Sequence, residues 1–368
     1  MQPTDNLWPR FTRPDYTQGM AAKIREVPLP RKLRFMEVCG THTVNIARFG
    51  LRNLLGRAVE MVSGPGCPVC VTHGADIDLA LELAREKGVT VATFGDVMGV
   101  PGSDGSLWTE KARGRDIRVV YSPRAALDMA RRERGKQVVF LAFGFETTIP
   151  AVLLTLERAM AEKIPNFSLL AFHKRTPPAV RALLAGKDCK IDGFILPGHV
   201  STVIGRRAWD FIDEDFSLPA VIAGFDAADI LSGIHELLKM TAGKPRVLNA
   251  YRRAVTEEGN PRALHLLETY LKPFAASWRG LGVIPDSGLK LKEEFHPFDA
   301  AKRFGLTPQK AAAPRGCICG DILKGKSFPS DCPLFAGTCR PDQAVGPCMV
   351  SSEGACGAYY KYGRRVLP

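Results

Sequence analysis

The chain has 368 residues, of which 45% are hydrophobic and 24% are charged, a composition typical of a folded protein with two or three domains. The longest apolar runs, such as VVFLAFGF from Val138, have the length of a buried strand and fall well short of the roughly 20 residues that cross a bilayer. The formal net charge is +12, but the basic residues are scattered and no aromatic stripe accompanies them. We therefore expect no membrane segment and no nucleic-acid partner, and an acidic protein partner explains the charge equally well.

Short β-branched runs alternate along the chain with amphipathic segments. The predicted strands cover residues 33–38, 59–63, 89–94, 117–121, 137–143, 168–172, 193–196 and 220–223. The predicted helices cover residues 45–55, 77–87, 123–133, 151–163, 178–185 and 227–240. Strict alternation of strand and helix indicates βαβ units with parallel sheets, so the predicted fold class is α/β.

The glycine-rich, polar stretch PGSDGSLWTEKARGRD interrupts this alternation before a second series of strands begins near Tyr121. We therefore predict two small parallel-sheet α/β domains, residues 1–120 and 121–242, that face each other across a cleft. Residues 243–368 are predicted to form a third domain that is helical from Tyr251 to Leu271 and then rich in loops. We expect roughly the first 30 residues to pack on this third domain.

Loops with reactive residues follow nearly every predicted strand. These loops are CGTHT (39–43), GPGCPVC (64–70), FGDVMGVPGS (94–103), FGFETT (143–148), FHKRTPP (172–178), PGHVS (197–201) and AGFD (223–226). In open parallel sheets the functional groups collect at the carboxyl ends of the strands. The sequence therefore places the functional site in the cleft.

Cys39 follows the first predicted strand at a point where a helix is about to begin, with Thr41 or Thr43 as the expected N-cap. The partial positive charge of a helix N-terminus is expected to lower the thiol pKa and favour a nucleophile or metal ligand. His42 could act as an acid, a base or a hydrogen-bond donor to whatever Cys39 binds. The alternative is a buried small hydrophobic residue with an incidental histidine neighbour.

Cys67 and Cys70 have C-x-x-C spacing. Such a pair can form a disulfide, exchange it with another pair or share a soft metal. A zinc finger would need a second pair, which His73 alone does not supply.

The loops of the second series of strands carry further polar candidates, each of which could be functional or could hold its loop by hydrogen bonds. These residues are Glu146, His173, His199 and Asp226. Cys189 belongs to no motif and is predicted to have no function.

Six cysteines crowd the end of the chain: Cys317, Cys319, Cys332, Cys339, Cys348 and Cys356. Four thiolates complete a [4Fe–4S] cluster, and two would remain for a redox-active pair. Zinc and structural disulfides are the alternatives. Because the N-terminal residues show no basic segment followed by an apolar one, we expect no signal peptide and a cytoplasmic, reducing location.

Several of these motifs resemble those of the HypD family of [NiFe]-hydrogenase maturation factors. They are CGTHT, GPGCPVC, FGFETT, LPGHVS and, near the C-terminus, GCICG, CPLF, GTC, GPCMVSSEGAC and AYY. The resemblance covers nearly the whole chain. It implies two α/β domains, a third domain with a [4Fe–4S] cluster, and a scaffold on which the Fe(CN)2CO moiety of the hydrogenase is assembled. It also implies HypC as the partner, with cyanide delivered transiently from the thiocyanate carried by HypE.

By the same resemblance, Cys39 would bind the iron together with a cysteine of HypC, and His42 would lie beside it. Cys67 and Cys70 would be further iron ligands or an electron-donating dithiol. We expect the chain alone to be monomeric, and to act as a redox-active scaffold more than as a turnover enzyme.

The cysteine-rich end also resembles ferredoxin:thioredoxin reductase. This second resemblance implies that the cluster ligands are Cys317, Cys332, Cys339 and Cys348. Cys319 and Cys356 would form the redox disulfide, although Cys317 and Cys319 could exchange roles. A relay from this pair to the cleft pair requires the C-terminal domain to fold back over the cleft.

Two other function classes stay open. A stand-alone iron–sulfur thiol-disulfide oxidoreductase would need a substrate pocket and an electron donor, and the sequence has neither a GxGxxG fingerprint nor a P-loop lysine. A pure interaction scaffold would keep the cluster for structure alone. A radical-SAM enzyme is not expected, because the chain has no C-x3-C-x2-C spacing.

Overall fold

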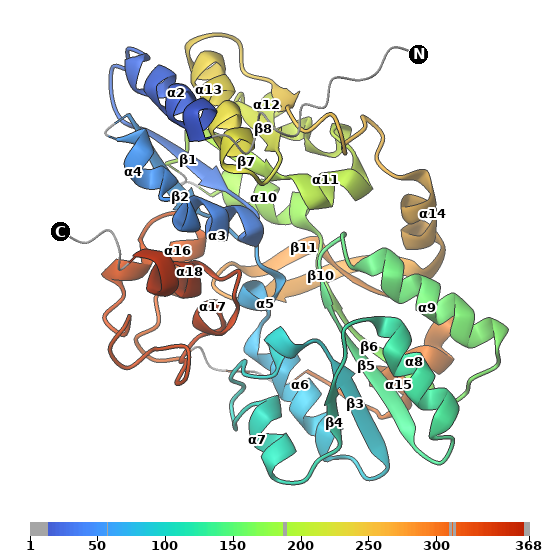
Figure 1. Cartoon of the computed structure of the whole chain (residues 1–368). Helices are drawn as coiled ribbons and strands as arrows, with labels where there is room; N and C mark the ends of the chain where they lie inside the picture. Colours follow the sequence, from blue (N-terminus) through green and yellow to red (C-terminus); the bar gives the residue numbers. More distant parts are fainter. Residues whose placement is uncertain (1–13, 57, 187–189, 309–310, 312–313, 364–368) are drawn as a thin grey trace.

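All eight predicted strands form, and they pair in two parallel sheets (Figure 1). The structure is a computed structural model and describes residues 14–56, 58–186, 190–308, 311 and 314–363. The five-stranded sheet has the order β2-β1-β7-β8-β9, with β1 Leu33–Glu37, β2 Val59–Ser63, β7 Gly193–Pro197, β8 Ala220–Ala223 and β9 Val247–Asn249. The four-stranded sheet has the order β4-β3-β5-β6, with β3 Val89–Thr93, β4 Ile117–Val119, β5 Gln137–Gly144 and β6 Phe167–His173. The predicted α/β class is confirmed.

The division predicted at residues 120 and 121 does not coincide with these sheets. β1 pairs with β7, with Phe35 opposite Gly193, whereas β3 pairs with β5, with Val89 opposite Gln137. The chain leaves the first sheet after β2, builds the whole second sheet, and returns at β7. Strands that are buried on both faces have similar apolar sequences, so the order of the segments along the chain did not reveal which strands are neighbours.

Helices lie around both sheets (Figure 1). The longer helices are α2 Pro14–Glu26, α3 Gly40–Arg48, α6 Gly74–Arg85, α8 Pro123–Arg132, α9 Ile149–Ala161, α10 Thr176–Leu184, α11 Gly198–Ile204, α13 Ala227–Ala242, α14 Pro261–Tyr270 and α18 Ala355–Tyr362. The shorter ones are α4 Leu51–Leu55, α5 Pro68–Val71, α7 Leu107–Ala112, α12 Phe211–Glu214, α15 Ala300–Arg303, α16 Cys319–Leu323 and α17 Pro347–Val350, with 3-10 turns η1 Gly95–Val97, η2 Arg207–Trp209, η3 Glu293–Phe298 and η4 Pro329–Asp331. No described helix combines the length and the apolar character needed to span a membrane.

Helix α2 packs on α13 and α4, beside the five-stranded sheet. Its Ala21 and Ile24 are buried in the same apolar cluster as Leu51 and Leu55 of α4. The sequence had suggested that the N-terminal region packs on the C-terminal segment. Its described part, α2, packs on α13 and α4 instead. The apolar face of α2 is instead buried in the cluster that includes Ile230 and Ile234 of α13.

An antiparallel hairpin follows α14 and was missed from the sequence. Its strands are β10 Leu271–Trp278 and β11 Gly282–Leu291, and it lies between the two sheets (Figure 1). The Trp278 ring stacks on Phe145 at 5.9 Å between centroids. Just beyond, the Arg279 Nε donates to the carbonyl of Thr72 over 3.0 Å. The hairpin thereby fixes α5, the short helix that carries Cys70, against the four-stranded sheet.

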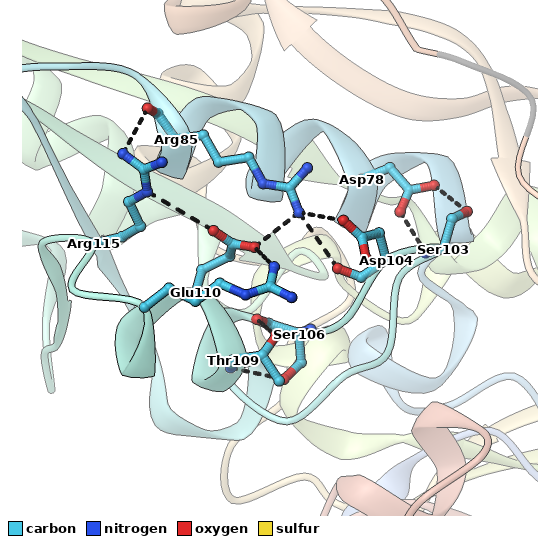
Figure 2. A network of polar contacts seen from close by, with 9 residues as sticks. Asp78, Arg85, Ser103, Asp104, Ser106, Thr109, Glu110 and Arg115 are labelled. Carbon is cyan, nitrogen blue, oxygen red and sulfur yellow. Dashed lines mark hydrogen bonds and ion pairs between the residues drawn. The ribbon is translucent and has the colours of Figure 1, made fainter.

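The loop after β3 is fastened by a network of charged and polar side chains (Figure 2). The Glu110 carboxylate of α7 is almost wholly buried and accepts hydrogen bonds from Arg85 over 2.8 Å and from Arg113 over 2.7 Å. On the same loop, Asp78 of α6 accepts from the backbone N–H and the hydroxyl of Ser103. The hydrogen bond from Arg85, followed by that from Arg113, lowers the pKa of Glu110. Because these hydrogen bonds are strongest to an ionised carboxylate, the network holds α7 on α6 when Glu110 is charged.

We predict that Glu110→Ala lowers the free energy of unfolding by about 1–2 kcal/mol at neutral pH, because two charge-assisted hydrogen bonds are lost. Since the pKa of Glu110 is lower in the folded chain than in the unfolded one, this stabilisation is present above the usual glutamate pKa and disappears as the pH falls through the folded value. Denaturant unfolding of both proteins across the acid range measures the effect. The exposed Glu82→Ala on α6 is the control, and an equal loss in both variants would contradict the prediction.

Candidate functional site

The strand ends of both sheets open into one cavity of about 570 Å³. The five-stranded sheet contributes Cys39, Gly66, Pro68 and His199, and the four-stranded sheet contributes Phe94, Asp96, Phe143, Thr147 and Thr148. The C-terminal segment adds Ser352 and Glu353. The predicted cleft at the carboxyl ends of the strands is confirmed, but the contribution of Glu353 was missed.

Two glycines let three loops meet at Cys39. Gly40 N–H donates to the carbonyl of Gly66 over 2.9 Å, and a Cβ atom at Gly66 would overlap the backbone of Val38 and Cys39. A Cβ atom at Gly40 would come within 2.5 Å of the Cβ of Glu353. The CGTHT loop, the GPGCPVC loop and the C-terminal segment are therefore packed backbone against backbone.

Cys39 is itself the N-cap residue of α3, with φ −150° and ψ 124°. The predicted caps do other things, because the Thr43 hydroxyl donates to Glu37 and the Thr41 hydroxyl donates to Glu353. Burial raises the pKa of Cys39 to about 12, and the nearby carboxylates of Glu353 and Glu37 add to the rise. The predicted lowering by the helix N-terminus is wrong, because removal from water outweighs the backbone hydrogen bonds that favour the thiolate.

Glu37 lies two residues before Cys39 and was not singled out from the sequence. Its carboxylate is fully buried and accepts from the Cys39 backbone N–H over 3.1 Å as well as from Thr43. Burial raises the pKa of Glu37 to about 7. This carboxylate fixes the turn between β1 and α3 on which the orientation of Cys39 depends.

His42 is not among the described residues that line the cavity. It is buried, its Nε2 donates to the carbonyl of Gly224 over 2.8 Å, and its ring stacks on Phe225 at 4.8 Å. Burial lowers the pKa of His42 to about 4, so the ring is neutral. His199 also stacks on Phe225, at 3.9 Å, and it does line the cavity. Among the described residues, His199 is therefore the histidine that lines the cavity with Cys39.

The other polar candidates, Glu146, His173 and Asp226, are not among the described residues that line the cavity. Glu146 is buried and accepts from the backbone N–H and the hydroxyl of Thr176, each over 2.8 Å, which holds its loop. His173 is buried, and burial lowers its pKa to about 3. Asp226 is the N-cap residue of α13, and the His73 ring caps α6. Cys189 lies outside the described residues.

Cys67 and Cys70 are joined by a disulfide, one of the three states that the spacing allows. Cys67 is the N-cap residue of α5, and its sulfur accepts from the Cys70 N–H over 3.2 Å. The exposed fractions of the two residues are 4% and 1%. The disulfide therefore lies beneath the cleft surface, out of contact with bulk solvent.

The six C-terminal cysteines line a single second cavity, together with Ile322, Leu334, Phe335, Gly346 and Met349. All six are free thiols in the structure, including Cys319 and Cys356. A hydrogen bond with Cys319, followed by burial, raises the pKa of Cys317. For Cys356, burial is the first cause of a raised pKa and the neighbouring thiols are the second. The pairing of Cys319 with Cys356 stays a prediction.

This cavity fits an iron–sulfur cluster by its donor atoms. Its lining offers only sulfur ligands among apolar side chains, and thiolate sulfur is the ligand that iron–sulfur clusters take. Among the described residues, no three His, Cys, Asp or Glu side chains are arranged to hold one metal ion. A cubane needs one thiolate on each of its irons. Thiols that are spread around a cavity are therefore better placed to bind a cubane than to bind a single metal ion.

One loop of the C-terminal segment touches all three sulfur sites. Cys348 of α17 lines the cysteine cavity, and α17 packs on α5. Ser351 Oγ lies 3.4 Å from the Cys67 sulfur. Two residues later, Glu353 accepts from the Thr41 hydroxyl over 2.8 Å. The C-terminal segment therefore reaches the cleft, which is the position that a relay between the sulfur sites would require. The polar residues between the cysteines of GPCMVSSEGAC were the overlooked signal.

We predict that Gly66→Ala is strongly destabilising, by about 3 kcal/mol, because the new methyl group has no space against the Cys39 backbone. Gly135→Ala is the matched control, since its Cβ would meet nothing within 4 Å. Thermal unfolding of both variants measures the difference. A Gly66→Ala protein as stable as the control would show that the two loops are not in contact.

Comparison with known proteins agrees with this architecture. The sequence profile of the HypD family, described as "Hydrogenase formation hypA family", matches residues 15–363. The hydrogenase maturation factor HypD of Cupriavidus necator is 44% identical over 365 residues, which cover 96% of both chains. The HypD proteins of Escherichia coli (46% over 334 residues, 90% of both chains) and Rhodobacter capsulatus (42% over 365 residues, 96% of this chain and 97% of the relative) are similarly close. A match of this extent leaves one assignment: the chain belongs to the HypD family.

Proposed function

We propose that this protein is a hydrogenase maturation factor that holds the iron of the Fe(CN)2CO moiety at Cys39 while its ligands are added. The observation that carries the proposal is the position of Cys39. Among the described residues it is the one cysteine that lines the cleft cavity, and its thiol is free. The iron unit is cargo, and Cys39 would hold it through its thiolate once metal binding removes the proton.

The proposal assigns the remaining ligands of the iron to partner proteins. One thiolate does not complete the coordination of a soft metal centre, so the proposal assigns a second thiolate to a cysteine of HypC. Cyanide would arrive from the thiocyanate carried by HypE. Asp96, His199 and Glu353 line the same cavity as Cys39 and are available to orient the incoming groups by hydrogen bonds.

The electrons for cyanide transfer are assigned to the C-terminal segment. Cys317, Cys332, Cys339 and Cys348 would hold a [4Fe–4S] cluster, which supplies electrons when bound. Cys319 and Cys356 then remain for thiol exchange with the pair Cys67 and Cys70. The packing of α17 on α5 supports this assignment, because exchange requires the sulfur sites to be near neighbours.

The disulfide also favours a second candidate, a stand-alone thiol-disulfide oxidoreductase. Such an enzyme must present its disulfide to substrates. The burial of Cys67 and Cys70 argues against access by a substrate from solution and supports an internal partner. Infrared spectroscopy of the protein purified with HypC separates the two, since only the scaffold carries CN and CO stretching bands of low-spin iron.

We predict that the chain isolated without oxygen contains about four iron and four sulfide ions, as one cubane requires. Replacing Cys332 or Cys339 by Ser should remove the iron and the brown colour. Cys189→Ser is the control and should keep both. A reconstituted wild-type protein that binds only zinc would contradict the cluster.

We further predict that Cys39→Ser keeps the fold and the cluster iron but loses the CN and CO bands of the complex with HypC. The reason is that the hydroxyl is a far weaker ligand for soft iron than a thiolate. Iron analysis and infrared spectra of the same preparation test both halves. If the bands persist, the iron is held elsewhere, and Cys67 and Cys70 become the candidates.

A further inference from the structure

The hydroxyl of Ser351 has two polar neighbours that together fix the direction of its proton. Its oxygen accepts the backbone N–H of Glu353 over 3.2 Å. The other neighbour is the Cys67 sulfur, at 3.4 Å. Because a disulfide sulfur carries no proton, the hydroxyl must be the donor in this second contact. Ser351 is 3% exposed, so water competes little for this proton.

The two sulfurs of the disulfide are therefore not equivalent. Cys67 accepts from the Cys70 N–H and lies within reach of the Ser351 hydroxyl. No donor contacts the Cys70 sulfur within the part of the chain that the structure describes. Hydrogen bonds to sulfur strengthen as negative charge develops on it. The reduced state of Cys67 thus gains more from its surroundings than the disulfide does.

We propose that Ser351 is a positioning residue that sets the redox poise of the cleft disulfide by donating a hydrogen bond to Cys67. This inference rests on the proposed thiol relay and names the residue that couples the cysteine-rich segment to the cleft. Ser351 lies in the loop between Cys348 and Cys356, which both line the cysteine cavity. A shift of this loop would change the hydrogen bond and hence the ease of reduction.

The reaction is a two-electron thiol–disulfide exchange. A dithiol reductant gives two electrons, and its own sulfurs become a disulfide while the bond between Cys67 and Cys70 breaks. One of its two protons goes to Cys70 and the other to solvent, so that Cys67 stays a thiolate that accepts the hydrogen bond of Ser351. In the first step the attacking thiolate bonds to the Cys70 sulfur, and Cys67 leaves with the electron pair. The Ser351 hydroxyl stabilises this leaving sulfur, while attack on Cys67 would expel the less stabilised Cys70.

The test is the equilibrium between this disulfide and dithiothreitol. Full-length wild type, Ser351→Ala and Ser232→Ala are equilibrated without oxygen in buffers of graded dithiothreitol composition at fixed pH, trapped by alkylation and analysed by peptide mass spectrometry. We expect Ser351→Ala to make the disulfide about three- to tenfold harder to reduce, the typical effect of one hydrogen bond. Tenfold corresponds to about 30 mV for a two-electron couple.

Ser232→Ala is the matched control, because the Ser232 hydroxyl is buried without a hydrogen-bond partner among the described residues. It should titrate like the wild type. An unchanged equilibrium in Ser351→Ala, or an equal change in both variants, overturns the role of Ser351.

Two variants that each lack one cysteine of the disulfide locate the effect. In Cys70→Ser, the Ser351→Ala change should alter the mixed-disulfide equilibrium of Cys67 with glutathione, whereas in Cys67→Ser it should leave that of Cys70 unchanged. The opposite pattern overturns the assignment to Cys67. Iron analysis of the same samples distinguishes the two proposals. If the disulfide equilibrium shifts but no cluster is bound, only the cluster as the electron source is refuted. If a cluster is bound but the equilibrium does not shift, only the role of Ser351 is refuted.

Discussion

The contact between the loops that follow β1 and β2 is the constraint on which the cleft depends. Gly66 has no space for a side chain because its Cα faces the backbone of Cys39, and Gly40 is pressed in the same way against Glu353. These approaches bring a free thiol, a disulfide-bearing helix and a loop of the cysteine-rich segment into one small region. If one of the three moved, it would lose its close contact at Gly66 or Gly40. The two glycines therefore define the geometry of the whole site.

Burial changes the acidity of thiols in both the cleft and the cysteine cavity. Cys39, Cys319 and Cys356 all have raised pKa values, and removal from water is the first cause for Cys39 and Cys356. A thiol in such surroundings stays protonated and resists oxidation. It becomes a thiolate when a metal ion compensates the charge. At Cys39 this effect of burial outweighs the helix N-terminus, which acting alone would have favoured the thiolate.

The sequence predicted the strands well and their partners poorly. Apolar runs bounded by glycine located β2 and β8 to the residue, and the strand-end rule located the cleft. The pairing of Phe35 with Gly193 was invisible, because a strand buried on both faces carries no mark of its neighbour. His42 was misjudged for a related reason. Its motif placed it near Cys39 along the chain, but Cys39 is the N-cap residue with an extended backbone, and the His42 ring packs on Phe225 and donates to Gly224 instead of lining the cavity.

The interleaved order of the two sheets also bears on how the chain folds during synthesis. The four-stranded sheet is contiguous in sequence, so it can assemble as soon as β6 has left the ribosome. β1 and β2 appear first but must wait for β7, the central neighbour of β1, and pairings between such distant segments form late. Until then their apolar edges are open to misassociation. His199, which follows β7, and the loops after β3 and β5 line the same cavity, so the cavity is complete only after this last pairing.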